Sequence, residues 1–180
     1  MAEQPSDLML AHYRADAEEV ERLRTGRDLD VFEAAALGAA ARLGELLAGD
    51  PTLANAWSPD GAQPLHFASF FGHPEACRVL LAHGAEVGTP ARGFNGVAPI
   101  NSAAANDPKA DEVCTEIVRL LLEHGAEVDA PQGGGATALH SAALARNAEL
   151  ARLLVAHGAD PDAAMEDGRT PRTLWPELPA

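Results

Sequence analysis

The seven histidines are the side chains in this 180-residue sequence best suited to bind a metal ion or to exchange protons near neutral pH. Three of them lie in the similar phrases LLAHGAEV, LLEHGAEV and LVAHGADP, and two more lie in the phrases PLH and ALH. In chain order these five are His66, His83, His124, His140 and His157. Side chains that recur with a repeated phrase stack in parallel columns, so they do not converge on one tetrahedral site. His12 and His73 belong to neither phrase, and we expect no metal site.

The sequence also lacks the motifs of nucleophilic and phosphate chemistry. It contains no G-x-S-x-G, G-x-x-x-x-G-K-[ST] or G-x-G-x-x-G, and the glycine run at 133–137 has neither the lysine nor the preceding strand of a phosphate loop. Cys77 and Cys114 are too few for a disulfide scaffold and lack the spacing of a zinc site. Both lie in or beside apolar stripes, so we expect them to be small buried hydrophobic residues. We predict no catalytic residues and no cofactor.

The composition narrows the fold and the partners. There are 13 Lys and Arg residues against 27 Asp and Glu residues, which gives a net charge of −14 and argues against direct binding to nucleic acid or anionic membranes. Hydrophobic residues make up 47% of the chain but aromatic residues only 4%, so the apolar content is largely Ala and Leu and favours an all-α fold. With no export signal and no long apolar stretch, we expect a cytoplasmic protein without a membrane span.

A repeat organises the sequence. The phrases PLHFAS, PINSAA and ALHSAA begin at Pro64, Pro99 and Ala138, each upstream of one HGA phrase. The spacing from His124 to His157 is 33 residues, and that from His83 to His124 is 41 because the middle copy carries an insertion. Most of the extra residues fall around the segment Asn106 to Val113. A period of 33 to 34 residues is typical of a solenoid built from stacked supersecondary units.

This period, together with PLHFAS, TALHSAA and the three HGA phrases, resembles the ankyrin repeat. The resemblance implies an all-α solenoid in which each unit is a β-turn finger followed by two antiparallel helices. Turn dipeptides precede each first helix, prolines stand at the helix starts, and glycines follow the second helices. The resemblance also implies that His66 and His140 form structural hydrogen bonds to turn backbone. In the middle repeat, Ala98 replaces the usual Thr and Asn101 replaces the usual His.

We divide the chain accordingly. The predicted segments are an N-terminal helix and tail (1–27), a capping unit (28–57), three repeats (about 58–92, 93–131 and 132–165) and a partial C-terminal cap (166–180). The apolar spacing predicts one N-terminal helix from Ser6 or Asp7 to about Arg24. We expect this helix to cover the flank of the first unit, since terminal repeats need capping. The alternative is a detachable helix that binds a partner.

The resemblance also implies where a partner would bind. The finger tips and the exposed side of the first helices form the concave face, which in ankyrin proteins usually contacts another protein. The candidate partner-binding residues on this face are Trp57, Asp60, Phe70, Phe71, Phe94, Val97 and Leu144. Exposed aromatic residues are typical of binding hot spots. The competing interpretation is that these aromatic side chains pack between fingers and helices.

We therefore predict a monomeric, non-catalytic module that binds another protein through the concave face. A second hypothesis is an acidic inhibitor that occupies the basic site of a nucleic-acid-binding or other cationic protein, so that its partner is basic. A third hypothesis is an enzyme that uses the histidines. The inserted segment Asn106 to Val113 is either a further partner contact or a tolerated surface insertion.

Overall fold

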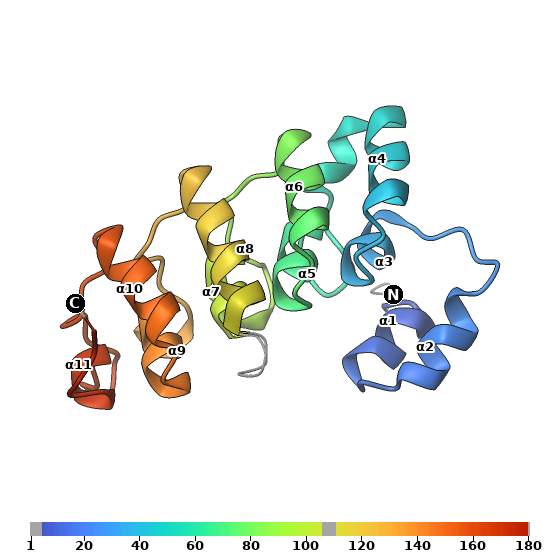
Figure 1. The fold of residues 1–180 in the computed structure, drawn as a ribbon. Coiled ribbons are helices and arrows are strands. Elements are labelled where there is room, and N and C mark those ends of the chain that lie inside the picture. The colour runs from blue at the N-terminus through green and yellow to red at the C-terminus, as the bar shows by residue number, and fades with distance from the viewer. Residues whose placement is uncertain (1–4, 106–110, 180) are drawn as a thin grey trace.

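The protein is a single row of stacked helical hairpins, as Figure 1 shows for the computed structural model, which describes residues 5–105 and 111–179. The described residues contain no strand, and the all-α prediction is confirmed. In chain order the α-helices are α1 (Asp7–Tyr13), α2 (Ala17–Arg24), α3 (Val31–Ala36), α4 (Ala40–Gly49), α5 (Pro64–Phe70), α6 (Pro74–Ala82), α7 (Pro99–Ala104), α8 (Asp111–Glu123), α9 (Ala138–Ala145), α10 (Ala148–Ala156) and α11 (Pro171–Leu174). Short 3-10 helices lie at η1 (Pro51–Asn55), η2 (Phe94–Gly96) and η4 (Gly133–Gly135).

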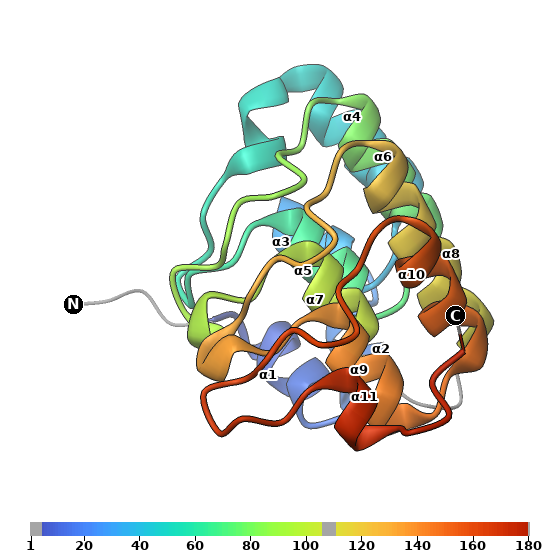
Figure 2. The ribbon, with the colours of Figure 1, turned by 90° about the vertical axis from the view of Figure 1, so that its left-hand side faces the viewer.

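The helices form two layers. Viewed along the row in Figure 2, the second helices α4, α6, α8 and α10 lie on one side, the finger loops lie on the other, and the first helices α3, α5, α7 and α9 lie between them. Each first helix carries a fully buried alanine near its centre; these are Ala34, Ala68, Ala103 and Ala142. Because an alanine adds only a methyl group, neighbouring first helices can pack closely and share one continuous core.

The local signals in the sequence explain where these helices begin and where the fingers turn. Pro64 and Pro99 stand in the first turns of α5 and α7, where a missing backbone N–H leaves no intrahelical hydrogen bond unmade. Asn95 and Gly134 adopt positive φ angles in the fingers, at 57° and 78°. The dipeptides predicted as tight turns therefore turn the chain as expected.

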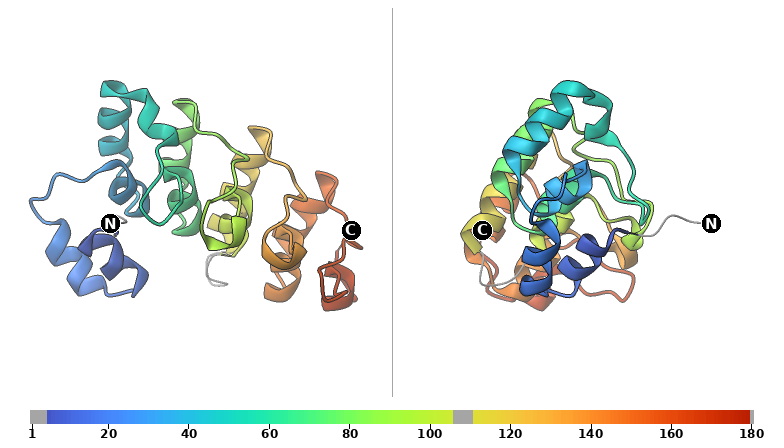
Figure 3. Two further views of the ribbon diagram at one scale, coloured as in Figure 1. Left: turned by 180° about the vertical axis from the view of Figure 1, so that it is seen from behind. Right: turned by 90° about the vertical axis from the view of Figure 1, so that its right-hand side faces the viewer.

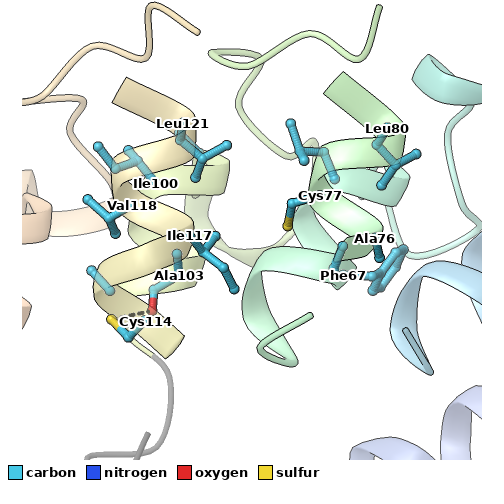
Figure 4. Close-up of a cluster of buried hydrophobic side chains, with 14 of the residues drawn as sticks. Phe67, Ala76, Cys77, Leu80, Ile100, Ala103, Cys114, Ile117, Val118 and Leu121 are labelled. Atoms are coloured by element: carbon cyan, nitrogen blue, oxygen red, sulfur yellow. Dashed lines mark hydrogen bonds between the residues drawn. The ribbon is translucent and has the colours of Figure 1, made fainter. Parts of the chain in front are cut away.

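The core lies between the two helix layers. Figure 4 shows Cys77 and Leu80 of α6, and Ile117 of α8, among the buried side chains that join successive repeats. The Cys114 thiol donates a hydrogen bond to the Ala103 carbonyl, with 3.0 Å between sulfur and oxygen. Burial raises the pKa of the Cys77 thiol to about 12, so it stays protonated at neutral pH. Both cysteines are buried thiols outside any disulfide, as predicted.

The prediction of one continuous N-terminal helix is wrong, because the segment forms two helices, α1 and α2. The chain turns between them at Ala15, whose φ angle is 54°, and the Asp16 carboxylate caps α2 by accepting the Glu19 N–H at 3.1 Å. The Asp16 N–H donates to the Ala11 carbonyl at 3.1 Å. In three later hairpins a backbone N–H likewise donates to the carbonyl of a buried alanine five residues earlier. The pairs are Ala39 to Ala34, His73 to Ala68 and Asn147 to Ala142. The N-terminal segment thus repeats the helix-turn-helix geometry of the units that follow.

The hairpin of α1 and α2 lies at one end of the row, where α1 packs against α3. Figure 3 shows α11, in dark red, at the opposite end. Leu8, Met9 and Ala11 of α1 are buried, whereas no residue of α2 is. The Ser6 hydroxyl donates to the buried Glu33 carboxylate at 2.6 Å, and Arg27 forms an ion pair with the same carboxylate at 2.7 Å. These contacts support the predicted capping role for α1, while α2 adds little burial.

The middle repeat shows how the chain tolerates a departure from the repeated phrase. Asn101 is fully buried, and its amide nitrogen donates to the Ala130 carbonyl, in the segment that leads to the next unit, at 3.0 Å. Its amide oxygen has no hydrogen-bond partner among the described residues. In the repeats that keep histidine, the corresponding Nδ1 atoms accept the N–H groups of Gln63 and Thr137. Asn101 therefore satisfies its donor through Ala130 but leaves its amide oxygen as a buried, unsatisfied acceptor.

We predict that Asn101→His stabilises the protein. An imidazole at this position would accept the Ala98 N–H through Nδ1 and face the Ala130 carbonyl with Nε2, which removes the unsatisfied buried oxygen. The free energy of unfolding should rise by about 1 kcal/mol, the net value of one hydrogen bond. Urea unfolding followed by circular dichroism measures the change, with Asn101→Ala as a control that loses the existing bond. A lower stability for Asn101→His than for the wild type would contradict this account.

Candidate partner-binding surface

Five histidines have structural roles, as the repeat predicts. The Nδ1 atoms of His66 and His140 accept the N–H groups of Gln63 at 3.2 Å and Thr137 at 3.1 Å. Burial lowers the pKa of both imidazoles, so they stay neutral at pH 7. The remaining three, His83, His124 and His157, donate from Nδ1 to the carbonyl four residues earlier, each at 2.8 Å, and so satisfy the last turn of a second helix. Within the described residues, no three His, Cys, Asp or Glu side chains are arranged to hold a metal ion.

His12 and His73 both lie close to the Ala36 carbonyl. The Nε2–H of His73 donates to the Ala36 oxygen at 2.9 Å, and the ring covers Gly38, where a Cβ atom would lie only 2.6 Å from Nδ1. The His12 ring faces the same carbonyl and packs on Phe71, with ring centroids 4.0 Å apart. Burial lowers the pKa of both histidines, and their mutual repulsion lowers that of His12 further.

Four large hydrophobic side chains are exposed in the described part of the chain. They are Tyr13 (38% exposed), Phe70 (46%), Phe94 (52%) and Leu144 (63%). Three of these were predicted at exposed positions from the sequence, and Tyr13 was missed. Tyr13 was overlooked because it was placed within a single N-terminal helix, where its spacing resembles that of a buried position.

Three of the four exposed side chains, Tyr13, Phe70 and Leu144, occupy the same position in every second unit. Each lies two residues after the buried alanine of its first helix, and the full series of such positions, from unit to unit, is Tyr13, Ala36, Phe70, Ala105 and Leu144. We call this series the concave row. Large and small side chains alternate along it. The signal was present in the sequence, but it becomes visible only when α1 is aligned with the other first helices.

Two predicted residues are less exposed than the concave-face interpretation requires. Phe71 is half-buried and packs edge-on against Phe70, with ring centroids 5.0 Å apart, as well as against His12. Trp57 is half-buried with the Arg92 guanidinium carbon 3.9 Å from its ring centroid. For these two side chains the competing interpretation, packing within the fold, describes the structure better.

Asp60 is also engaged within the fold. Its carboxylate accepts hydrogen bonds from the Tyr13 hydroxyl and from the Ser58 hydroxyl, and so ties α1 to the first finger. Each of the two carboxylate oxygens thus accepts one hydrogen bond from within the fold, which fixes the orientation of the side chain. Burial and the nearby Asp60 carboxylate raise the pKa of Tyr13, which therefore stays a neutral phenol.

The structure brings three predicted residues together around one hollow of about 290 Å³ on the concave face. Phe70, Phe94 and Val97 line it with Tyr13, and the other lining residues are Ala62, His66, Phe67, Ser102, Ala105 and Gln132. None of these side chains is ionised at neutral pH. Leu144 lies outside this hollow, while Trp57 and Asp60 line a second, neighbouring one of about 260 Å³. We call the first hollow the apolar hollow.

Stacked helical hairpins that are connected through turned fingers define a helical repeat protein. Two family models of ankyrin repeats match the chain, one with three copies over residues 8–132 and one with many copies over residues 121–174. The chain therefore belongs to the ankyrin-repeat family, whose members are in general protein–protein interaction modules. The match begins at residue 8, which agrees with the helix-turn-helix geometry of α1 and α2.

Two curated relatives share a short segment with this chain. Ankyrin repeat domain-containing protein 13B of Mus musculus and of Homo sapiens are each 63% identical to it over 30 residues, which is 17% of this chain and 5% of each relative. The similarity thus reaches about one repeat and a small fraction of those longer proteins. Among the described helices, none combines the length and apolar character needed to cross a membrane.

We predict that the protein loses stability as the pH falls through the titration range of histidine. In the unfolded chain His12 and His73 take up protons near pH 6.5, whereas their pKa values in the folded state are lower. The unfolded state then binds more protons, so the free energy of unfolding should decrease from pH 7.5 to about pH 5.5. Urea unfolding at a series of pH values measures this.

The matched control is the double variant His12→Gln/His73→Gln, whose glutamine at 73 can still donate to the Ala36 carbonyl but does not titrate. Its stability should depend less on pH than that of the wild type. The relief of carboxylate repulsion at low pH is common to both proteins and cancels in the comparison. Identical pH profiles would show that these two imidazoles do not contribute.

Proposed function

We propose that the protein is a non-catalytic module whose partner protein binds to the concave face, on the surface around Phe70 and Phe94. The observation that carries this proposal is the exposure of two phenylalanines at the edge of an uncharged apolar hollow. The family's general role in protein–protein interaction supports it. The stacking of the repeats does not require either ring, since both remain about half exposed in the folded chain.

Exposed aromatic side chains can contribute to the free energy of binding when a partner buries them. Burying apolar surface contributes about 25 cal/mol per Å², and aromatic residues in desolvated pockets dominate many interfaces. Phe70 is held edge-on by Phe71, so little side-chain freedom is lost when a partner covers it. A rigid apolar surface of this kind favours a partner that presents apolar side chains.

The distribution of charge favours apolar recognition over the alternative of an acidic inhibitor. The chain carries a net charge of −14, yet the side chains lining the apolar hollow are all neutral, and the carboxylate of Asp60 nearby is already engaged by Tyr13 and Ser58. An inhibitor that mimics an acidic ligand needs free carboxylates at the contact. The apolar hollow offers none.

We predict that Phe70 and Phe71 differ in their effects. Phe70→Ala should weaken partner binding about tenfold or more, which corresponds to roughly 1.4 kcal/mol, without lowering the melting temperature. Phe71→Ala should lower the melting temperature, because its half-buried ring packs against His12 of α1. The partner can be recovered by crosslinking in cells that express the protein, and affinities then measured by calorimetry with the purified partner. A lower melting temperature for Phe70→Ala with unchanged binding would place its ring in the core and contradict the proposal.

The salt dependence of binding gives a separate prediction. Apolar contacts are not screened by ions, so the affinity should change little between about 50 mM and about 500 mM sodium chloride. The association rate should fall with salt if the partner is basic, since the net charge of −14 attracts it at long range. Loss of the equilibrium affinity at high salt would instead favour the acidic inhibitor. Calorimetry and stopped-flow kinetics distinguish the two effects.

A further inference from the structure

We infer that the apolar hollow is a socket for one large uncharged side chain, aromatic or leucine-like, presented by a peptide segment of the partner. The inference rests on the proposed function and names the chemistry that the concave face recognises. It also makes α1 part of the binding site, because Tyr13 forms one wall of the socket.

The concave row explains why a hollow exists at this place. Phe70 and Leu144 project from the ends of α5 and α9, and between them the row has Ala105. Alanine ends at Cβ, so the volume that a large side chain would fill at this position is open to solvent. Ala105 lines the apolar hollow and is itself exposed. The alternation of large and small residues thus leaves room for a side chain from outside.

The size and chemistry of the hollow limit what it can take. Its volume of about 290 Å³ lies at the lower end of the range for small-molecule sites, which suits a single amino-acid side chain better than a cofactor. Bringing a charged group into a neutral apolar site is unfavourable unless a partner charge is present. The side chains that line the hollow supply no such partner charge, so the occupant is uncharged. The net charge of −14 also repels acidic segments, so the flanking residues of the partner are neutral or basic.

The walls are held in place before anything binds. The Tyr13 hydroxyl donates to the Asp60 carboxylate, which also accepts the Ser58 hydroxyl, so α1 and the first finger move together. The Phe70 ring leans on Phe71, which in turn packs against His12. A site whose side chains are already ordered loses less entropy when it binds a ligand.

Phe94 provides an independent indication that this surface binds something. It adopts a φ angle of 49°, in the left-handed region that residues with a Cβ atom avoid, at the tip of the second finger. Counted back from the helix that follows, the other fingers have Pro59, Gly133 and Glu166 at this position, and none of these has a positive φ angle. The fold therefore does not require the conformation. It places a half-exposed ring at the edge of the socket, and strained residues of this kind cluster at ligand-binding sites.

The test is a substitution that fills the socket with a side chain of the protein itself. In Ala105→Phe, a phenyl ring stands at the position that Phe70 occupies in the preceding repeat, so the end of α7 should accept it without loss of stability. Ala105→Ser is the matched control, because serine is small and leaves the socket open. Phe94→Gly removes one wall and also relieves the left-handed backbone. Peptides are selected from a random 12-residue phage-displayed library against the wild type, and their affinities for each variant are measured by calorimetry.

We expect selected peptides to share one aromatic or leucine-like residue whose replacement by alanine weakens binding at least tenfold. Ala105→Phe and Phe94→Gly should each weaken binding at least tenfold, while Ala105→Ser binds like the wild type. The urea midpoint should be unchanged in Ala105→Phe and unchanged or higher in Phe94→Gly. A charged anchor residue, or full affinity in Ala105→Phe, would overturn the inference.

A second probe gives a result even if no peptide is selected. N-acetyl-tryptophanamide and N-acetyl-argininamide are titrated at millimolar concentration while amide resonances are followed by nuclear magnetic resonance. The tryptophan probe should shift the amides of Val97 and Ala105 in the wild type but not in Ala105→Phe, and the arginine probe should shift neither. No shift with the tryptophan probe overturns the socket. If the peptides bind Phe70→Ala more weakly but bind Ala105→Phe like the wild type, the socket is wrong and the proposed function stands. If the peptides bind every variant of the concave face like the wild type, both the socket and the proposed function are wrong.

Discussion

A helical hairpin of about twenty residues cannot bury its apolar stripe by itself, and every other feature of this protein depends on that constraint. Each hairpin needs a neighbour, and the neighbours approach closely because the first helices have a buried alanine where they meet. The two ends of the row then need covering. Leu8, Met9 and Ala11 of α1 are buried at one end, and at the other Pro171 of α11 is buried and Trp175 is half-buried. The stability of each repeat therefore depends on the interfaces that it forms with its neighbours.

The same constraint acts on the fingers. Gly93 allows the second finger to approach the first, because a Cβ atom there would lie 2.5 Å from the Asp60 carbonyl oxygen. The Arg92 N–H donates to the Gly61 carbonyl at 2.7 Å, and at the last finger the Glu166 N–H donates to Gly134 at 2.9 Å. Backbone bonds from finger to finger fix the concave face as part of the scaffold. The side chains on that face are then free to vary, since the backbone holds the fingers together.

Periodicity determines how much of this could be predicted from the sequence. Wherever the repeated phrases occur, residues such as His66 and Gly134 lie where the period places them, and the exposure of Phe70, Phe94 and Leu144 followed from the same alignment. The N-terminal segment carries no such phrase. Its apolar spacing continues through the turn at Ala15, so two helices looked like one. The positions of the individual repeats could be read from the chain, but this first hairpin could not.

Contacts between distant residues were the second kind of information that the sequence lacked. Tyr13 and Asp60 are 47 residues apart, and their hydrogen bond depends on how α1 is placed against the stack. Phe71 was assigned to the concave face by its position before Gly72, but α1 brings His12 against its ring. Asp60 was predicted as a partner-binding residue of the first finger, and Tyr13 of the same helix donates a hydrogen bond to its carboxylate. Each of these contacts involves a residue of α1, so the misjudged N-terminal hairpin is the common reason that the sequence did not reveal them.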